Sequence, residues 1–263
     1  DDYIFNYQAI KDIGFLKGKE YRNYENYTNQ IRKCMEISDG YIVSTESLKR
    51  VIENQFPNKE VIVNRNVASM EMTISSLTLE KVQKDYITIG YFSGTKTHND
   101  DFESIKEELI SIMRQNKKVH LLIGGQIELP ADFNEVKDQV ETFKFVSWQE
   151  LPHLISKADI NLMPLENTIF HECKSENKWM EAALVNVPTI ASWNRELALV
   201  IHDGEDGFLC KNSEEWTEKL CQLIEDNELR NRMAQNAHER VMKEYLTDDI
   251  EPEIVRSVVD DVK

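Results

Sequence analysis

Residues 86–123 read YITIGYFSGTKTHNDDFESIKEELISIMRQNKKVHLLI. The first and last runs of this stretch, residues 86–92 and 119–123, are apolar on both faces, which is typical of strands covered on two sides. Between them, Asp100 and Glu103 have the spacing of a helix capping box, and apolar residues then recur at helical period. The stretch therefore predicts a strand, a helix and a second strand parallel to the first.

The same alternation continues toward the C-terminus. Further apolar runs predict strands at residues 142–146, 159–163 and 187–191. Segments of helical period predict helices at residues 149–157, 175–185, 212–225 and 227–244. Strands that alternate with helices predict an α/β fold with a doubly wound parallel sheet.

The beginning of the chain has a shorter α/β pattern. It predicts the end of a strand at residues 3–5, helices at 21–37 and 46–55, and strands at 40–43 and 61–63. Residues 64–84 are polar and predict a linker. We therefore expect three parts: a second, incomplete α/β domain with its linker at 1–75, the doubly wound domain at 76–246, and a C-terminal helix at 247–263 that packs back toward the N-terminal part.

Composition limits the function classes. The chain has 263 residues with 31 Lys plus Arg against 47 Asp plus Glu, a net charge of −16, so a general nucleic-acid binder is not expected. The four cysteines form no CxxC pair, which gives no zinc signature and favours reduced thiols in a cytoplasm. No apolar run has the length of a membrane span. We expect a cytoplasmic location, including the inner face of a membrane. The basic residues of the predicted helix at 21–37 would contact the membrane surface there.

Ligands of a doubly wound sheet bind outside the carboxyl ends of its strands, so the residues that follow each strand are candidates. The first strand of the larger domain is followed by Ser93, Gly94, Thr95 and Lys96. Gly94 permits a tight turn, while the other three offer hydroxyls, amides and one cation to a phosphate. A plain strand-to-helix turn is the alternative interpretation.

The strand at residues 159–163 is followed by the richest candidate segment. Ser175 is a favourable N-cap for the helix that follows, and Lys174 and Lys178 flank that helix start. A helix N-terminus offers N–H groups and a partial positive charge, so this arrangement predicts a diphosphate site that needs no metal. The alternative is that both lysines are ordinary solvated surface residues.

Several segments resemble the carboxyl-terminal, donor-binding domain of GT-B glycosyltransferases, of the group 1 or family 4 type. They are IGYFSGTKTHNDDF, LLIGG, FVSWQELPHLISKADINLMPL, KSENKWMEAALVNVPTIAS, VIHDGEDGFLC and NSEEWTEKLCQLIEDNELRNRMAQNAHERV. Two earlier segments, SDGYIVSTESLKRVI and KEVIVNRNVAS, are similar to the last part of the amino-terminal domain of that family. The resemblance implies a GT-B-like fold, with a Rossmann-like donor domain and an acceptor-side domain of which the front is lacking, as well as further domains of a larger polypeptide.

The resemblance also implies roles for individual residues. Glu181 matches the acidic residue that contacts the nucleotide ribose, and Glu172 and Cys173 fall at the place of the acid that contacts the donor sugar. The donor phosphates would be held by Ser93, Gly94, Thr95, Lys96, Lys174, Ser175, Glu176, Asn177 and Lys178, and the base by Ser147, Trp148 and Leu151. Lys96 and Lys178 would be catalytic, because cations stabilise the charge that builds on a diphosphate leaving group.

The expected activity is that of a glycosyltransferase, of the retaining and metal-independent kind. It would move a hexosyl unit from a nucleotide-diphospho sugar to a glycan, lipid-linked or protein acceptor in cell-surface glycan synthesis, without a cofactor. The alternative is a non-catalytic domain that binds nucleotide sugars or serves as a scaffold in a larger glycosyltransferase. A nicotinamide-dependent oxidoreductase is disfavoured because no GxGxxG opens a strand-to-helix turn.

Overall fold

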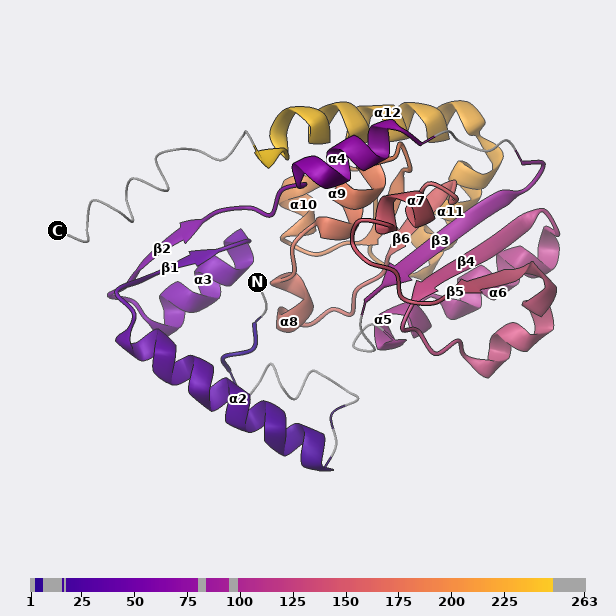
Figure 1. Ribbon diagram of the computed structural model, residues 1–263. Helices are drawn as coiled ribbons and strands as arrows, with labels where there is room; N and C mark the ends of the chain where they lie inside the picture. The colour runs from indigo at the N-terminus through magenta and orange to yellow at the C-terminus, as the bar shows by residue number, and fades with distance from the viewer. Residues whose placement is uncertain (1–2, 7–15, 17, 80–83, 95–98, 248–263) are drawn as a thin grey trace.

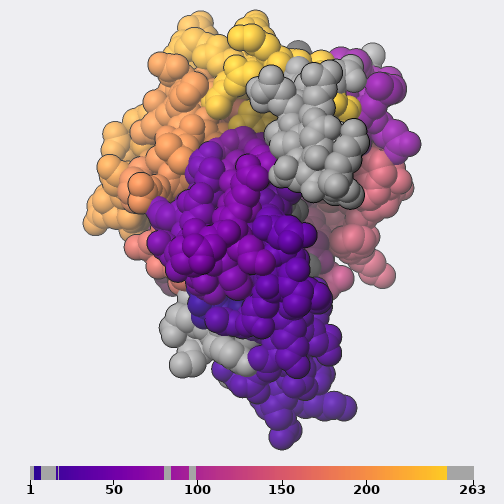
Figure 2. Space-filling model, turned by 90° about the vertical axis from the view of Figure 1, so that its left-hand side faces the viewer, coloured from indigo at the N-terminus to yellow at the C-terminus, as the bar shows by residue number. Residues whose placement is uncertain are grey.

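The computed structural model describes residues 3–6, 16, 18–79, 84–94 and 99–247. Its larger unit is built on a six-stranded sheet, and a smaller unit on a two-stranded sheet lies beside it (Figure 1). Seen from the side of the smaller unit, that unit forms a narrow projection below the larger one (Figure 2). No helix among the described residues combines the length and the apolar character needed to cross a bilayer.

The sheet of the larger unit has the strand order β5-β4-β3-β6-β7-β8, and every adjacent pair is parallel. Its strands are β3 (Ile87–Ser93), β4 (Val119–Gly125), β5 (Val140–Phe143), β6 (Ile160–Met163), β7 (Thr189–Ser192) and β8 (Phe208–Cys210). The order reverses between β3 and β6, so the predicted doubly wound parallel sheet is confirmed. β8 was not predicted because its three residues are too few to show a pattern.

Helices cover both faces of this sheet. They are α5 (Asn99–Glu103), α6 (Lys106–Gln115), the 3₁₀ segment η2 (Ala131–Gln139), α7 (Leu151–Ile155), α8 (Ile169–Glu172), α9 (Asn177–Leu184), α10 (Leu197–Val200), α11 (Ser213–Glu225) and α12 (Asn227–Glu244). The single helix predicted from Asp100 is broken into α5 and α6, because Ile105 has the non-helical backbone angles φ −122° and ψ 11°.

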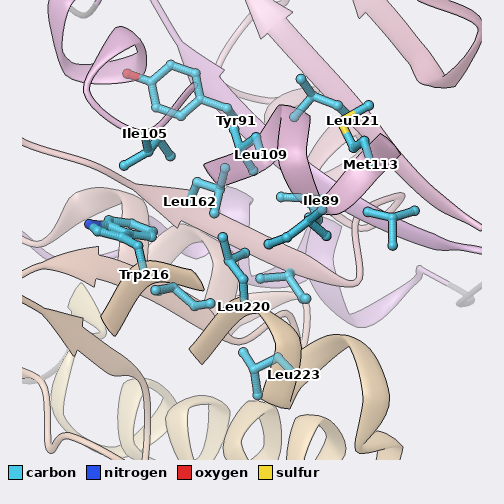
Figure 3. Packing of buried hydrophobic residues seen from close by; sticks show 14 of the residues in the cluster. Ile89, Tyr91, Ile105, Leu109, Met113, Leu121, Leu162, Trp216, Leu220 and Leu223 are labelled. Atoms are coloured by element: carbon cyan, nitrogen blue, oxygen red, sulfur yellow. The ribbon is translucent and has the colours of Figure 1, made fainter. Parts of the chain in front are cut away.

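Apolar side chains pack on both faces of the sheet, which explains why its strands are continuous apolar runs in the sequence. On one face, Ile89, Tyr91, Leu121 and Leu162 pack against Leu109 and Met113 of α6 and against Trp216 and Leu220 of α11 (Figure 3). On the other face, Phe92 and Leu122 pack against Leu154 of α7 and Ala182 of α9. Alternate residues of one strand therefore belong to opposite cores, as expected of a sheet covered on both sides.

The smaller unit contains α2 (Gly18–Ile37), β1 (Gly40–Val43), α3 (Glu46–Gln55) and β2 (Glu60–Val63), with β1 and β2 parallel. These elements match the predicted pattern closely. The strand end predicted at residues 3–5 is wrong: no strand is formed there, and Tyr3 and Phe5 instead pack as buried rings against Leu48 and Ile52 of α3.

The predicted linker contains a helix, α4 (Met70–Leu77), whose N-cap Ser69 accepts a hydrogen bond from the Met72 amide. Met72 packs in the same apolar cluster as Trp179, and the Ala68 amide donates to the Tyr245 carbonyl at 2.8 Å. The chain therefore joins the larger unit from about residue 68, ahead of the predicted boundary. Most of the predicted C-terminal helix lies outside the described residues, which end at 247.

Candidate functional site

A cleft of about 500 Å³ opens at the carboxyl ends of β3, β4 and β6. From the larger unit it is lined by Phe92, Ser93, Gly94, Gly124, Gly125, Phe145, Val146, Trp148, Leu151, Leu154, Met163, Leu165, Phe170, Lys174, Ser175, Asn177, Lys178 and Glu181, and Ile4 and Tyr24 come from the smaller unit. Both units thus contribute to its wall, at the place where doubly wound sheets bind ligands.

The start of α9 forms one wall of the cleft. Ser175, predicted as the N-cap, is not in that role: Glu176 holds the N-cap position without a side-chain cap bond, and the Ser175 hydroxyl accepts a hydrogen bond from Asn66 at 2.8 Å. The side chain of the N-cap residue therefore does not cap this helix start. The Asn177 side-chain oxygen is buried there with no partner among the described residues. The wall offers polar groups to a ligand.

Two lysines bring positive charge to this wall. Lys178 lies half-buried on the first turn of α9, and its ammonium donates to the Phe92 carbonyl at 2.5 Å. Burial lowers the pKa of Lys178, and the nearby Glu181 carboxylate opposes that effect. The Lys174 ammonium lies 4.9 Å from the centre of the Phe170 ring. The two predicted cations are therefore brought together in one cleft.

Glu181 lies one turn further along α9 and also lines the cleft. Burial raises the pKa of Glu181 from 4.5 to about 7, and the Lys178 cation works against this rise. Near neutral pH the carboxyl is therefore close to the midpoint of its titration. In the ionised form its oxygens are acceptors suited to a pair of sugar hydroxyls.

The raised pKa of Glu181 predicts a pH-dependent cost to stability. Below pH 4.5 the carboxyl is protonated in both the folded and the unfolded chain, and the cost appears as pH rises from 4.5 through about 7. We therefore compare the free energy of unfolding of Glu181→Gln with that of the wild type at each pH. From pH 4 to pH 8 this difference is expected to shift in favour of the variant by up to about 3 kcal/mol. Urea denaturation at both pH values measures this. Glu218→Gln, at an exposed site on α11, is the control, and an equal change in both variants would contradict the assignment.

Two of the three residues predicted to hold the base line the same cleft. Trp148 and Leu151 line it, and the Trp148 side chain is 46% exposed and accessible for stacking. Ser147 is not part of the lining: its carbonyl accepts hydrogen bonds from the Glu150 and Leu151 amides and so starts the turn that leads into α7. Ser147 is placed as a structural residue of this wall.

The side chains of Glu172, Cys173 and Glu176 are engaged outside the cleft lining. This does not fit the donor-sugar contacts predicted for Glu172 and Cys173, and it leaves the backbone amide of Glu176, the group expected to meet the phosphates. The Glu172 carboxylate is engaged by Arg50 at 2.5 Å and by the Ser47 hydroxyl at 3.1 Å. Cys173 is fully buried in the apolar cluster of the smaller unit. The Glu176 carboxylate pairs with Arg65 at 3.2 Å. Glu172 and Cys173 therefore do not present side chains to a donor sugar here, and Glu176 offers only its backbone.

The loop after β3 lies only partly within the described residues. Ser93 and Gly94 line the cleft as predicted, whereas Thr95 and the predicted catalytic Lys96 lie outside the described part of the chain. Gly124 and Gly125, which are not among the predicted site residues, also line it. The signal for them was the same as for Ser93, namely their place directly after a strand.

One group of potential metal ligands lies behind the cleft. The nearest ligand atoms of Asp101, Glu166 and His171 lie within 4.8 Å of one another. The His171 Nε2 is 3.2 Å from Asp101, its Nδ1 is 2.8 Å from the Thr168 hydroxyl, and none of these side chains lines the cleft. A hydrogen-bonded chain from Thr168 through the imidazole to Asp101 accounts for this geometry.

Comparison with known proteins gives a family match. The family model described as glycosyl transferases group 1 matches residues 71–240, which is more than half of the chain and covers the cleft-forming strands and helices. A search of curated proteins returns no match.

Solved structures share the fold at low sequence identity. HepE from Anabaena, solved with UDP and glucose, has a TM-score of 0.67 and 16% identity over 98% of this chain and 70% of its own. TarM from S. aureus, in a complex that includes UDP, gives 0.66 and 16% over 92% and 48%. A pneumococcal O-GlcNAc transferase, GtfA, solved with UDP and GlcNAc, gives 0.65 and 16% over 89% and 47%. The present chain thus spans about half to 70% of these proteins.

Proposed function

This chain belongs to the glycosyl transferases group 1 family, and from that premise we propose that its cleft binds a nucleotide-diphospho sugar and that the protein transfers the hexosyl unit to an acceptor. One observation carries the proposal. Lys174, Lys178 and the start of α9 line the same cleft as the exposed ring of Trp148. A diphosphate beside the lysines and a base beside the ring would match the chemistry of both.

The proposed transfer needs a stabilised leaving group. As the bond between the sugar and the diphosphate breaks, negative charge develops on the diphosphate oxygens, and a fixed cation and helix-end amides lower the energy of that charge. We assign Lys178 to this role, with Lys96 as a second cation from the loop after β3. These groups supply positive charge to the diphosphate, so we propose a metal-independent reaction. Retention at the sugar carbon is proposed from the family resemblance alone.

The acceptor and the cellular role belong to the proposal as well. We propose a glycan, lipid-linked or protein acceptor, in cell-surface polysaccharide synthesis at the cytoplasmic side of a membrane. HepE bound to UDP and glucose and GtfA bound to UDP and GlcNAc support a sugar nucleotide as the donor. Because the chain spans at most 70% of these proteins, acceptor binding would also use parts of the polypeptide beyond these residues.

Calorimetric titration with UDP, GDP, dTDP and CDP tests donor binding, each with magnesium or with EDTA. We expect one diphosphate to bind preferentially and with the same affinity under both conditions. Binding that requires magnesium would contradict the metal-independent site, and no binding of any diphosphate would contradict the donor cleft. Turnover of the matching sugar nucleotide by the complete polypeptide then separates a transferase from a binding-only domain. The positions of Glu172 and Cys173, whose side chains lie outside the cleft wall, would favour the binding-only alternative.

A further inference from the structure

The segment that carries the proposed phosphate site is held from the side of the smaller unit. Glu172 is bound by Arg50 and Ser47 of α3, and the Cys173 carbonyl accepts a hydrogen bond from the Thr45 hydroxyl at 3.0 Å. Thr45 is also the N-cap of α3. In Figure 1, α8 and the chain that follows it lie next to the smaller unit. These contacts fix the chain just before it enters the cleft wall.

Two residues that follow β2 hold the next part of the segment. The Asn66 side-chain amide donates to the Ser175 hydroxyl at 2.8 Å, and the Arg65 guanidinium lies 3.2 Å from the Glu176 carboxylate. Glu176 is the N-cap residue of α9 and is almost completely buried. The direction in which α9 starts is therefore set by contacts with Arg65 and Asn66.

Arg65 also reaches a second buried carboxylate. Glu196, which precedes α10, lies 3.1 Å from the Arg65 guanidinium and accepts hydrogen bonds from the Glu46 and Ser47 amides at the start of α3. One guanidinium therefore joins the N-cap of α9, the chain before α10 and, through Glu196, the smaller unit. Such supporting contacts fix the rotamers and the backbone of the groups that meet a ligand.

We propose that Arg65 and Asn66 are positioning residues of the donor-phosphate site, so that donor affinity depends on the smaller unit as well as on the larger one. The inference rests on the proposed function of the cleft. Arg65 and Asn66 do not line the cleft themselves. They act by holding Ser175 and Glu176, so that Lys174, Asn177 and Lys178 face the diphosphate without being ordered at the moment of binding.

The test compares Arg65→Ala, Arg65→Lys and Asn66→Ala in the full chain. Affinities for UDP, GDP, dTDP and CDP are measured by calorimetry, and exchange of the amides of residues 173–178 is measured without ligand. We expect about a tenfold loss of diphosphate affinity for Arg65→Ala and about a fivefold loss for Asn66→Ala, with faster exchange in both. Arg65→Lys restores most of the affinity because it keeps a cation beside Glu176 and Glu196.

Arg240→Ala is the matched control. Arg240 pairs at 2.5 Å with Asp206, whose side chain is 4% exposed, and lies over the Trp179 ring, so its loss also removes a buried ion pair that contacts α9. We expect this variant to lose stability like Arg65→Ala and to keep the wild-type affinity and exchange. Wild-type affinity in Arg65→Ala and Asn66→Ala, or an equal loss in Arg240→Ala, would overturn the proposal.

A wild type that binds no diphosphate would contradict the proposed function separately. The amide exchange rates then decide the inference. Faster exchange of the amides of residues 173–178 in Arg65→Ala and Asn66→Ala, but not in Arg240→Ala, supports the positioning role, and unchanged rates contradict it.

Discussion

Lys178→Met is expected to lower the affinity of the cleft for its nucleoside diphosphate by about a hundredfold. The ammonium is half-buried and anchored on the Phe92 carbonyl, so it is already placed at the wall where the phosphates would bind. A cation held in a cleft with little water attracts a diphosphate more strongly than a solvated one does. Methionine is unbranched like lysine, reaches as far as its Cε position and removes the charge, so the fold is retained. Calorimetric titration with UDP, GDP, dTDP and CDP measures the effect.

The chain offers a close control for this variant. Lys219 also donates to a backbone carbonyl, that of Leu209 at 2.8 Å. Both ammonium groups lie over an aromatic ring, Lys178 over Tyr91 at 5.6 Å and Lys219 over Phe208 at 5.2 Å. Lys219 is absent from the cleft lining. Lys219→Met is expected to bind the diphosphate like the wild type. Unchanged affinity in Lys178→Met, or an equal loss in Lys219→Met, would remove Lys178 from the phosphate site.

Gly125→Ala is expected to destabilise the fold by about 3 kcal/mol or more, a large part of the roughly 5–15 kcal/mol that stabilises an ordinary domain. Gly125 ends β4 with a φ of +108°, a conformation that side chains disfavour, and a Cβ added there would lie 1.8 Å from the Ser93 carbonyl oxygen. That carbonyl accepts the Gln126 amide and belongs to the ladder between β3 and β4. The clash therefore falls on backbone that has no room to move.

Urea denaturation of Gly125→Ala and Gly94→Ala tests this explanation. At Gly94 the added Cβ would meet only the Phe145 ring, at an ordinary contact distance of 3.5 Å. Gly94→Ala is therefore expected to stay within about 1 kcal/mol of the wild type. Similar stability of both variants would show that the close approach at Gly125 relaxes without cost.

The fold could be predicted from the sequence because its strongest signals are local. Buried runs such as 119–123 need cover on two faces, and α12 begins and ends where its period and its Asp226 cap indicate. α4 was hidden because its pattern is inverted: Met70, Ile74 and Leu77 are exposed while Thr73 and Ser76 are buried, so no apolar stripe marks a helix that faces the core, although Ser69 is a favourable cap. Short elements such as β8 have too few residues to display a period.

The site was predictable in position but not in orientation. The rule that ligands bind at the carboxyl ends of parallel strands located Lys174 and Lys178, and the family resemblance added Glu181. It could not show that Ser175 would be engaged by Asn66 in place of capping α9, since that bond joins residues 109 positions apart. The burial of Cys173 likewise depends on apolar side chains contributed by the smaller unit.

The guanidinium of Arg65, shared by two carboxylates, also limits where the chain could be cut to join one of its units to another protein. The larger unit excised at residue 71, where the family match begins, would retain Glu176 and Glu196 and lose the only side chain that the structure pairs with both within its described ranges. Two buried carboxylates without a counter-charge are strongly destabilising. A chimaera that grafts the larger unit onto a foreign smaller unit would therefore have to carry residues 65–70 with it, so the point of exchange between the two units lies before Arg65.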